Sequence, residues 1–196
     1  MLDDGDLINF SDLVKTRVED ADGRHVGHVQ DMALGLDLSS PFIDALGIHM
    51  LWTDRVGGIT LVRRVEDLVA LVGWTHVASV DEDLVTVRGR HPDFPLLSAE
   101  GKLLVRRDIL NKQMVDLTGN RVQRVDDVLL VVDGERLKIA GLDVSKSLLL
   151  ASSTLRHYLA DVRRKYASVY DPEVIPWDAV RSIEEGAVVI NQHVRR

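Results

Sequence analysis

Cysteine is absent from this sequence of 196 residues. Disulfides, thiolate zinc sites and cysteine nucleophiles are therefore excluded, and the absence fits a reducing compartment. No apolar run approaches the roughly 20 residues that a helix needs to span a bilayer. The first ten residues, MLDDGDLINF, are acidic and lack the basic start and apolar stretch of a signal peptide. We therefore expect a soluble, cytoplasmic chain that does not itself span a membrane.

Basic residues are scarce in the first half of the chain. Residues 1–98 hold 8 Lys and Arg against 17 Asp and Glu, whereas residues 99–196 hold 16 against 14. The formal net charge of the whole chain is −7. Nucleic-acid binding needs clustered Lys and Arg to neutralise phosphates. The composition therefore argues against a nucleic-acid partner.

One passage occurs twice, at a constant offset of 96 residues. Residues 12–34 read DLVKTRVEDADGRHVGHVQDMAL and residues 108–130 read DILNKQMVDLTGNRVQRVDDVLL, with seven of 23 positions identical. WTHVASV at 74–80 and WDAVRSI at 177–183 form a second matched pair. Self-similarity of this kind indicates a duplicated supersecondary plan. We predict two similar domains, at 8–90 and 100–192, joined by a linker at 91–99.

Strand and turn patterns fill most of both copies. Apolar alternation and turn residues predict strands at 16–19, 26–38, 42–52, 59–62, 74–80, 84–87, 113–116, 121–132, 136–144 and 187–190. Residues 103–109 open the second copy. Residues 65–72 fit either a strand or a short helix, because a short apolar run does not separate the two. The Asp133-Gly134 dipeptide predicts a tight hairpin.

Residues 146–166 break this pattern and predict a helix. Apolar side chains recur there at helical spacing: Leu148, Leu155, Leu159, Val162 and Tyr166. This apolar stripe must bury against something. It packs against its own domain or docks a partner, so we take these five residues as candidate partner-binding residues.

The repeated motif resembles a known family. It reads GRHVGHVQD from Gly23 to Asp31 and GNRVQRVDD from Gly119 to Asp127. With a short strand before it and a Trp-containing strand after it, this motif resembles the PRC-barrel family, named for a domain of the photosynthetic reaction centre H subunit. The second half, with LKIAGLDVS at 137–145 and VIPWDAV at 174–180, is also similar to the region preceding the cytoplasmic domain in bacterial MgtE-type magnesium transporters.

The resemblance implies a mainly β fold, with two small PRC-like β-barrels from an internal duplication and one helix inserted in the second. It implies a non-enzymatic protein-binding or scaffold module. The alternative is a cytoplasmic regulatory segment of an MgtE-type magnesium transport system, at the inner face of the membrane. The expected partner is a protein, either a membrane transporter or the chain's own downstream domain, and a homo-oligomer stays open. No cofactor is expected.

Three residue types recur at equivalent places in the two copies. Asp31 and Asp127, with Asp126 beside the second, form either a divalent cation site or carboxylates that accept backbone N–H bonds. The repetition favours the second reading, because a role in the fold explains both copies. Trp74 and Trp177 are expected to plug the two cores. Gly23 and Gly119 are expected in turns.

No catalytic residues are predicted. The sequence contains no Gly-rich phosphate loop, no His-Glu-x-x-His motif and no Ser, His and Asp in triad order. His25 and His28 lie three positions apart on a predicted strand, where regular alternation places them on opposite faces. The spacing therefore predicts that these two histidines do not share a metal ion.

Overall fold

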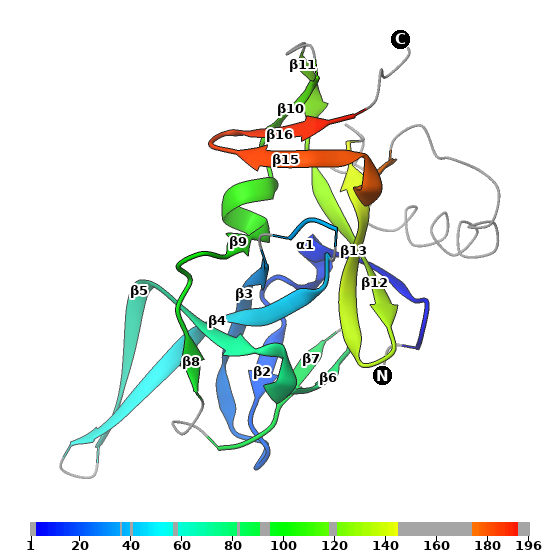
Figure 1. Ribbon diagram of the computed structural model, residues 1–196. Helices are drawn as coiled ribbons and strands as arrows, with labels where there is room; N and C mark the ends of the chain where they lie inside the picture. The colour runs from blue at the N-terminus through cyan, green and yellow to red at the C-terminus, as the bar shows by residue number, and fades with distance from the viewer. Residues whose placement is uncertain are drawn as a thin grey trace. The chain divides into compact units, whose positions relative to one another are not determined.

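The structure is a computed structural model that describes residues 3–35, 37–39, 41–56, 59–81, 83–90, 95–117, 121–144 and 174–191. These residues form antiparallel and mixed sheets (Figure 1), which confirms the predicted mainly β class. None of the sheets closes into a barrel within the described residues. The predicted helix at 146–166 lies outside the described residues, and so does Gly119.

The chain divides into two compact units built from interleaved segments. The first unit consists mainly of Asp12–Leu36 and Ile43–Leu104. The second unit contains Asp3–Ser11, Asp37–Phe42 and Val105–Arg196. The repeat had predicted two continuous spans, whereas the structure assigns two short N-terminal segments to the unit that contains the second copy.

One mixed sheet forms the first unit. Its strands are β2 (Arg17–Glu19), β3 (His25–Leu34), β4 (Ile43–Val56), β5 (Ile59–Gly73), β6 (Val77–Val80), β7 (Leu84–Val87), β8 (Leu96–Leu97) and β9 (Leu103–Leu104). The strand order is β6-β7-β2-β3-β4-β5-β8, and β9 also pairs with β3. Only β2 and β7 pair in parallel among these strands; the other pairs are antiparallel. Fully buried side chains that include Val18, Val29, Leu46, Ile48 and Leu71 make the core.

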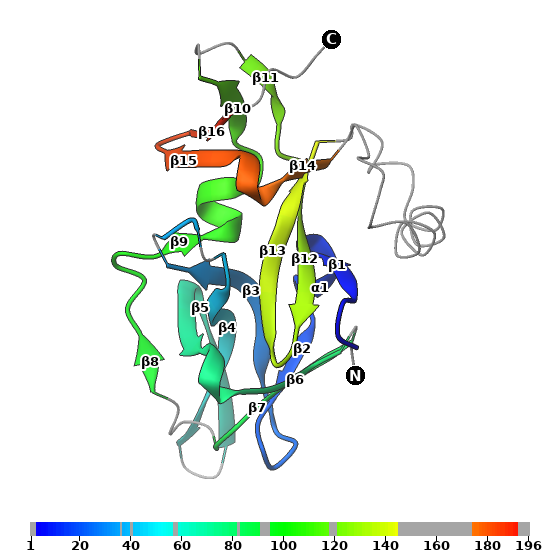
Figure 2. The same cartoon turned by 45° about the vertical axis from the view of Figure 1, so that its right-hand side comes forward.

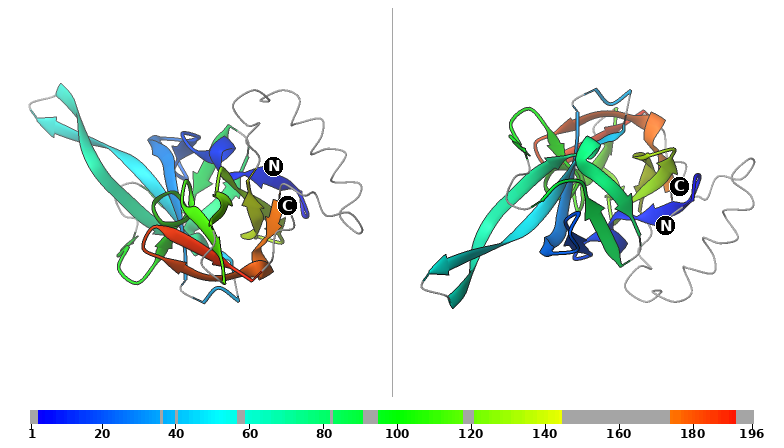
Figure 3. Two further views of the ribbon diagram at one scale, coloured as in Figure 1. Left: turned by 90° about the horizontal axis from the view of Figure 1, so that it is seen from above. Right: turned by 90° about the horizontal axis from the view of Figure 1, so that it is seen from below.

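The β4–β5 hairpin is longer than the sequence pattern indicated. Residues 65–72 belong to a continuous β5, which settles the ambiguity there in favour of a strand. Pairing with β3 ends at Met50, and β4 and β5 then continue as a two-stranded ribbon as far as the Val56–Ile59 pair. Figure 3 shows this ribbon extending away from the rest of its sheet.

Two four-stranded sheets form the second unit. They contain β1 (Leu7–Asn9), β10 (Gln113–Asp116), β11 (Arg121–Arg124), β12 (Asp127–Asp133), β13 (Arg136–Asp143), β14 (Val174–Pro176), β15 (Val180–Glu184) and β16 (Ala187–Ile190). Their orders are β1-β12-β13-β14 and β11-β10-β16-β15. Residues 103–109, which open the second copy, divide into β9 and a single π-helical turn at Val105–Ile109. The predicted β12–β13 hairpin forms, but its two-residue turn is Gly134-Glu135 rather than Asp133-Gly134, because Asp133 belongs to β12 and pairs with Arg136. Gly134 has a φ of 60°.

The two copies repeat one plan in detail. β6-β7-β2-β3 in the first unit corresponds to β15-β16-β10-β11 in the second, and β2∥β7 corresponds to β10∥β16. Lys15 and Asn111 occupy the same place in the two copies, and they are the two non-glycine residues with positive φ in the described part of the chain. The Lys15 amide donates to Val29 at 2.8 Å, and the Asn111 amide donates to Val125 at 2.9 Å. The conserved offset of 96 residues is thus visible in the backbone as well as in the sequence.

The leading strands of the two copies are exchanged. β1 precedes the first copy but pairs with β12 of the second, from Leu7 opposite Val131 to Asn9 opposite Leu129 (Figure 2). β9 precedes the second copy but pairs with β3 of the first. Each leading strand therefore completes the sheet of the other copy.

Candidate functional site

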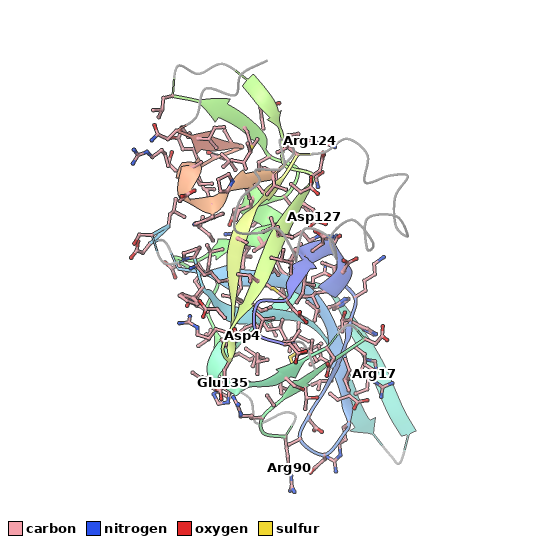
Figure 4. The ribbon with its side chains drawn as sticks, turned by 90° about the vertical axis from the view of Figure 1, so that its right-hand side faces the viewer. Asp4, Arg17, Arg90, Arg124, Asp127 and Glu135 are labelled. Carbon is pink, nitrogen blue, oxygen red and sulfur yellow. The ribbon has the colours of Figure 1, made fainter. Side chains whose placement is uncertain are left out.

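Asp127 is a buried carboxylate that holds the N-terminal segment to β12. It begins β12 and is only 1% exposed. One of its oxygens accepts hydrogen bonds from the backbone amides of Ser11, at 3.2 Å, and Val128, at 2.8 Å. The Ser11 hydroxyl donates to its other oxygen. Figure 4 labels Asp127 among the side chains. A buried charge needs such partners, because an unpaired one is strongly destabilising.

Asp31 occupies the equivalent place in the first copy. It is also buried, and its Oδ1 accepts the backbone amide of Met32 at 2.7 Å. Asp126, by contrast, is half-buried, and its amide donates to the Asp143 carbonyl at 2.8 Å. No group of three or more His, Asp or Glu side chains in the described residues is arranged to hold a metal ion. Asp31 and Asp127 both accept hydrogen bonds from backbone amides.

The Asp20–Gly23 turn is closed by its own carboxylate. The Asp20 side chain is buried and accepts the amides of Asp22 and Arg24, both at 2.9 Å. Gly23 has a φ of 73°, in the left-handed region that glycine adopts without strain. The structure thus places Gly23 in a tight turn.

Trp74 and Trp177 are both buried, and each begins a short 3₁₀ turn. The predicted strand at 74–80 is therefore wrong at its start, since the strand begins at Val77. The Trp177 indole N–H donates to the Leu38 carbonyl at 2.8 Å, which satisfies the one polar group of this large ring.

Three histidines share one face of the sheet in the first unit, contrary to the sequence prediction for two of them. The His25 and His28 rings lie edge to face with centroids 4.7 Å apart. A β-bulge explains the contact: Val18 pairs with Gly27 and Glu19 with His25, so Val26 is an extra residue in β3 and the regular alternation shifts. His28 pairs with His49 on β4, and residues directly opposite each other point to the same face.

β8 exposes two leucines at the end of the same sheet. Leu96 is 48% exposed and Leu97 is 41% exposed. β8 pairs with β5 and, within the described residues, with no further strand. The exposed Leu117 lies in the second unit, after β10. Sequence reasoning had assigned 91–99 to a linker, and only the sheet order reveals an edge strand there.

Comparison with known proteins adds no relative. A scan against protein-family models finds no match to this chain, and a search of the curated proteins finds none either. Among the described residues, no helix has the length and apolar character needed to cross a membrane.

Proposed function

We propose that this chain is a non-enzymatic protein-binding module and that β8 is its docking edge. The supporting observation is the pair Leu96 and Leu97, exposed on a terminal strand. A terminal strand presents backbone N–H and C=O groups to any extended segment that can pair with them. Proteins commonly blunt such edges with very short strands, charged residues or prolines. β8 is short and follows Pro95, but both of its own side chains are exposed leucines. The occupant that fits is an extended segment of a protein partner with apolar side chains, added as a further strand.

The proposed fold family is the PRC-type barrel, present twice. The support is the repeated strand order around a parallel pair, together with the two tryptophan-initiated turns. In this proposal the duplication supplies a scaffold, and the two halves differ in what they present. The first copy carries the long ribbon and the β8 edge, while the equivalent strand β13 of the second copy is only eight residues long.

The second candidate function is regulation of an MgtE-type magnesium transport system at the inner face of the membrane. It rests on the sequence resemblance of the second half. In that case the protein partner is a transporter or a downstream domain of the same polypeptide. Magnesium then raises the melting temperature more than sodium does at the same ionic strength, because a ligand that binds the folded state stabilises it.

The docking edge is tested with charge substitutions. Leu96→Lys/Leu97→Lys places two charges on the edge strand, where a partner strand would have to desolvate them. Leu117→Lys is the matched control, since it changes an exposed leucine in the other unit. All three substitutions replace exposed side chains and are expected to alter the free energy of unfolding by less than about 0.5 kcal/mol.

The partner is first identified by affinity capture from the native cells. Its dissociation constant is then measured by titration against each purified variant, and binding must be saturable. We expect the Leu96→Lys/Leu97→Lys variant to bind the partner at least about 30-fold more weakly, which is the loss typical of an interface hot spot of roughly 2 kcal/mol. The control should bind like the unmodified chain. If the edge variant and the control bind the partner with equal affinity, β8 is not the docking site.

A further inference from the structure

We propose that the histidine face of the first unit, formed by His25, His28 and His49, binds a divalent transition-metal ion such as Zn²⁺. The face joins two neighbouring strands. The rings of His25 and His28 touch, and His28 stands directly opposite His49. Imidazole nitrogen is a preferred ligand of zinc, copper and nickel, whereas magnesium prefers oxygen.

His25 makes one hydrogen bond that is typical of metal-ligating histidines. Its Nε2 lies 3.0 Å from the Gly27 carbonyl oxygen. A carbonyl can only accept, so Nε2 carries the proton and Nδ1 of the neutral ring keeps its lone pair. Ligating histidines usually donate their other N–H to a carboxylate or a backbone carbonyl, which fixes the tautomer and the ring. His25 has this arrangement with its own strand.

His49 supplies the second and independent observation. Its Nε2 is buried and has no hydrogen-bond partner among the described residues. An unpartnered buried polar atom is destabilising, and most such atoms in folded proteins find a partner. A metal ion at this nitrogen would supply one.

Charged groups on the neighbouring strand are compatible with a cation. Arg17 pairs with His28, and Glu19 pairs with His25, so both lie on the histidine face. Arg17 Nε and Glu19 Oε1 are 2.7 Å apart, so the guanidinium charge is balanced locally. No three ligating side chains in the described part of the chain already surround one point. Binding therefore draws the rings together by rotation about their side-chain torsions, which leaves room for solvent ligands on the metal.

The test uses the full chain with any affinity tag removed, because a polyhistidine tag would bind the same ions. Zn²⁺ is titrated by calorimetry at neutral pH, and Co²⁺ is titrated by visible absorption, which reports nitrogen ligation directly. We expect one ion per chain, with His28→Ala and His49→Ala each weakening binding at least about tenfold. His76→Ala is the matched control: His76 is a half-buried histidine of the same unit outside this face, and its removal should leave the affinity unchanged.

Three further readouts make the outcome decisive. Zn²⁺ should raise the melting temperature of the unmodified chain more than that of His49→Ala at the same concentration, and Mg²⁺ should raise neither. Acidification should weaken binding, because protonated imidazole cannot ligate. If an alanine variant does not fold, His28→Asn and His49→Gln take its place. Absence of binding, or binding that survives these substitutions, or an equal loss in His76→Ala overturns the proposal.

Discussion

Replacing Asp127 with alanine should strongly destabilise the second unit. The carboxylate is buried and accepts the amides of Ser11 and Val128, together with the Ser11 hydroxyl. Alanine leaves these donors without their acceptor. The Val128 amide is buried, and a stranded buried group costs about 1–3 kcal/mol, whereas Ser11 is exposed and water can reach its donors. The buried Val128 amide therefore predicts a loss of about 1–3 kcal/mol in the free energy of unfolding, and the lost hydrogen bonds of Ser11 add a smaller amount.

Ser11→Ala separates the side-chain part of this effect. It removes the hydroxyl donor but keeps the hydrogen bond from the backbone amide. Because Ser11 is exposed to solvent, we expect a loss of about 0.5–1.5 kcal/mol, the range for a typical hydrogen bond. In the Asp127→Ala background the same substitution should cost almost nothing, because its acceptor is gone. The difference between the two backgrounds is the coupling energy of a double-mutant cycle.

The assay is equilibrium unfolding in urea, combined with amide hydrogen exchange at β1 and at the paired residues of β12. Asp127→Ala should speed exchange at Ile8 and Leu130, which face each other across the β1–β12 pair. Metal-free buffer is used throughout, since the predicted loss does not involve a cation. A loss below about 1 kcal/mol, or a Ser11→Ala effect that is identical in both backgrounds, would show that this carboxylate does not anchor the N-terminal segment.

Three smaller predictions test other local features. Gly23→Ala should cost about 1–2 kcal/mol, because φ there is 73°. The control Gly73→Ala should be near neutral in the same urea titration, since φ is −56° and the added methyl meets only ordinary contacts. Trp177→Phe should cost about 1 kcal/mol in a thermal melt, through loss of the 2.8 Å indole hydrogen bond. Hydrogen bonds from the Ser39 hydroxyl and, to a smaller extent, from the Ser39 amide lower the pKa of Asp37 below its ordinary value of 3.8. These hydrogen bonds therefore contribute to the stability of the folded state above pH 3.8, and the contribution is lost as the pH falls through the lowered pKa. Ser39→Ala should return the pKa of Asp37 toward 3.8 in an NMR titration, and an unchanged pKa would contradict this cause.

Local patterns in the sequence predicted most of the strands. Alternation and turn chemistry located β2, β10, β7 and β16, because each is a short strand bounded by turn residues. The same reasoning began a strand too early at Trp74, where the chain makes a 3₁₀ turn, and it did not predict the π-helical turn at Val105–Ile109. A helical turn of three to five residues is too short to show a period that distinguishes it from a strand.

Features that depend on pairing partners were beyond the reach of the sequence. The exchange of β1 and β9 between copies leaves the apolar pattern of each strand unchanged, so no local signal reveals it. The histidine face was missed for a related reason. One extra residue, Val26, reverses the alternation and brings His25 beside His28, and a bulge is set by the register with β2. The β8 edge likewise depends on β5 as its neighbour.

The most direct test of the docking proposal is a photo-crosslinking amino acid placed at position 97 of the chain in its native cells. Position 117, exposed in the other unit, serves as the control. The account predicts a discrete crosslinked protein at position 97 that is absent at position 117, and that disappears when Leu96 is also replaced by lysine. Crosslinking at position 117 alone, or no crosslink at position 97 under conditions where the chain captures its partner, would contradict the assignment of β8 as the binding edge.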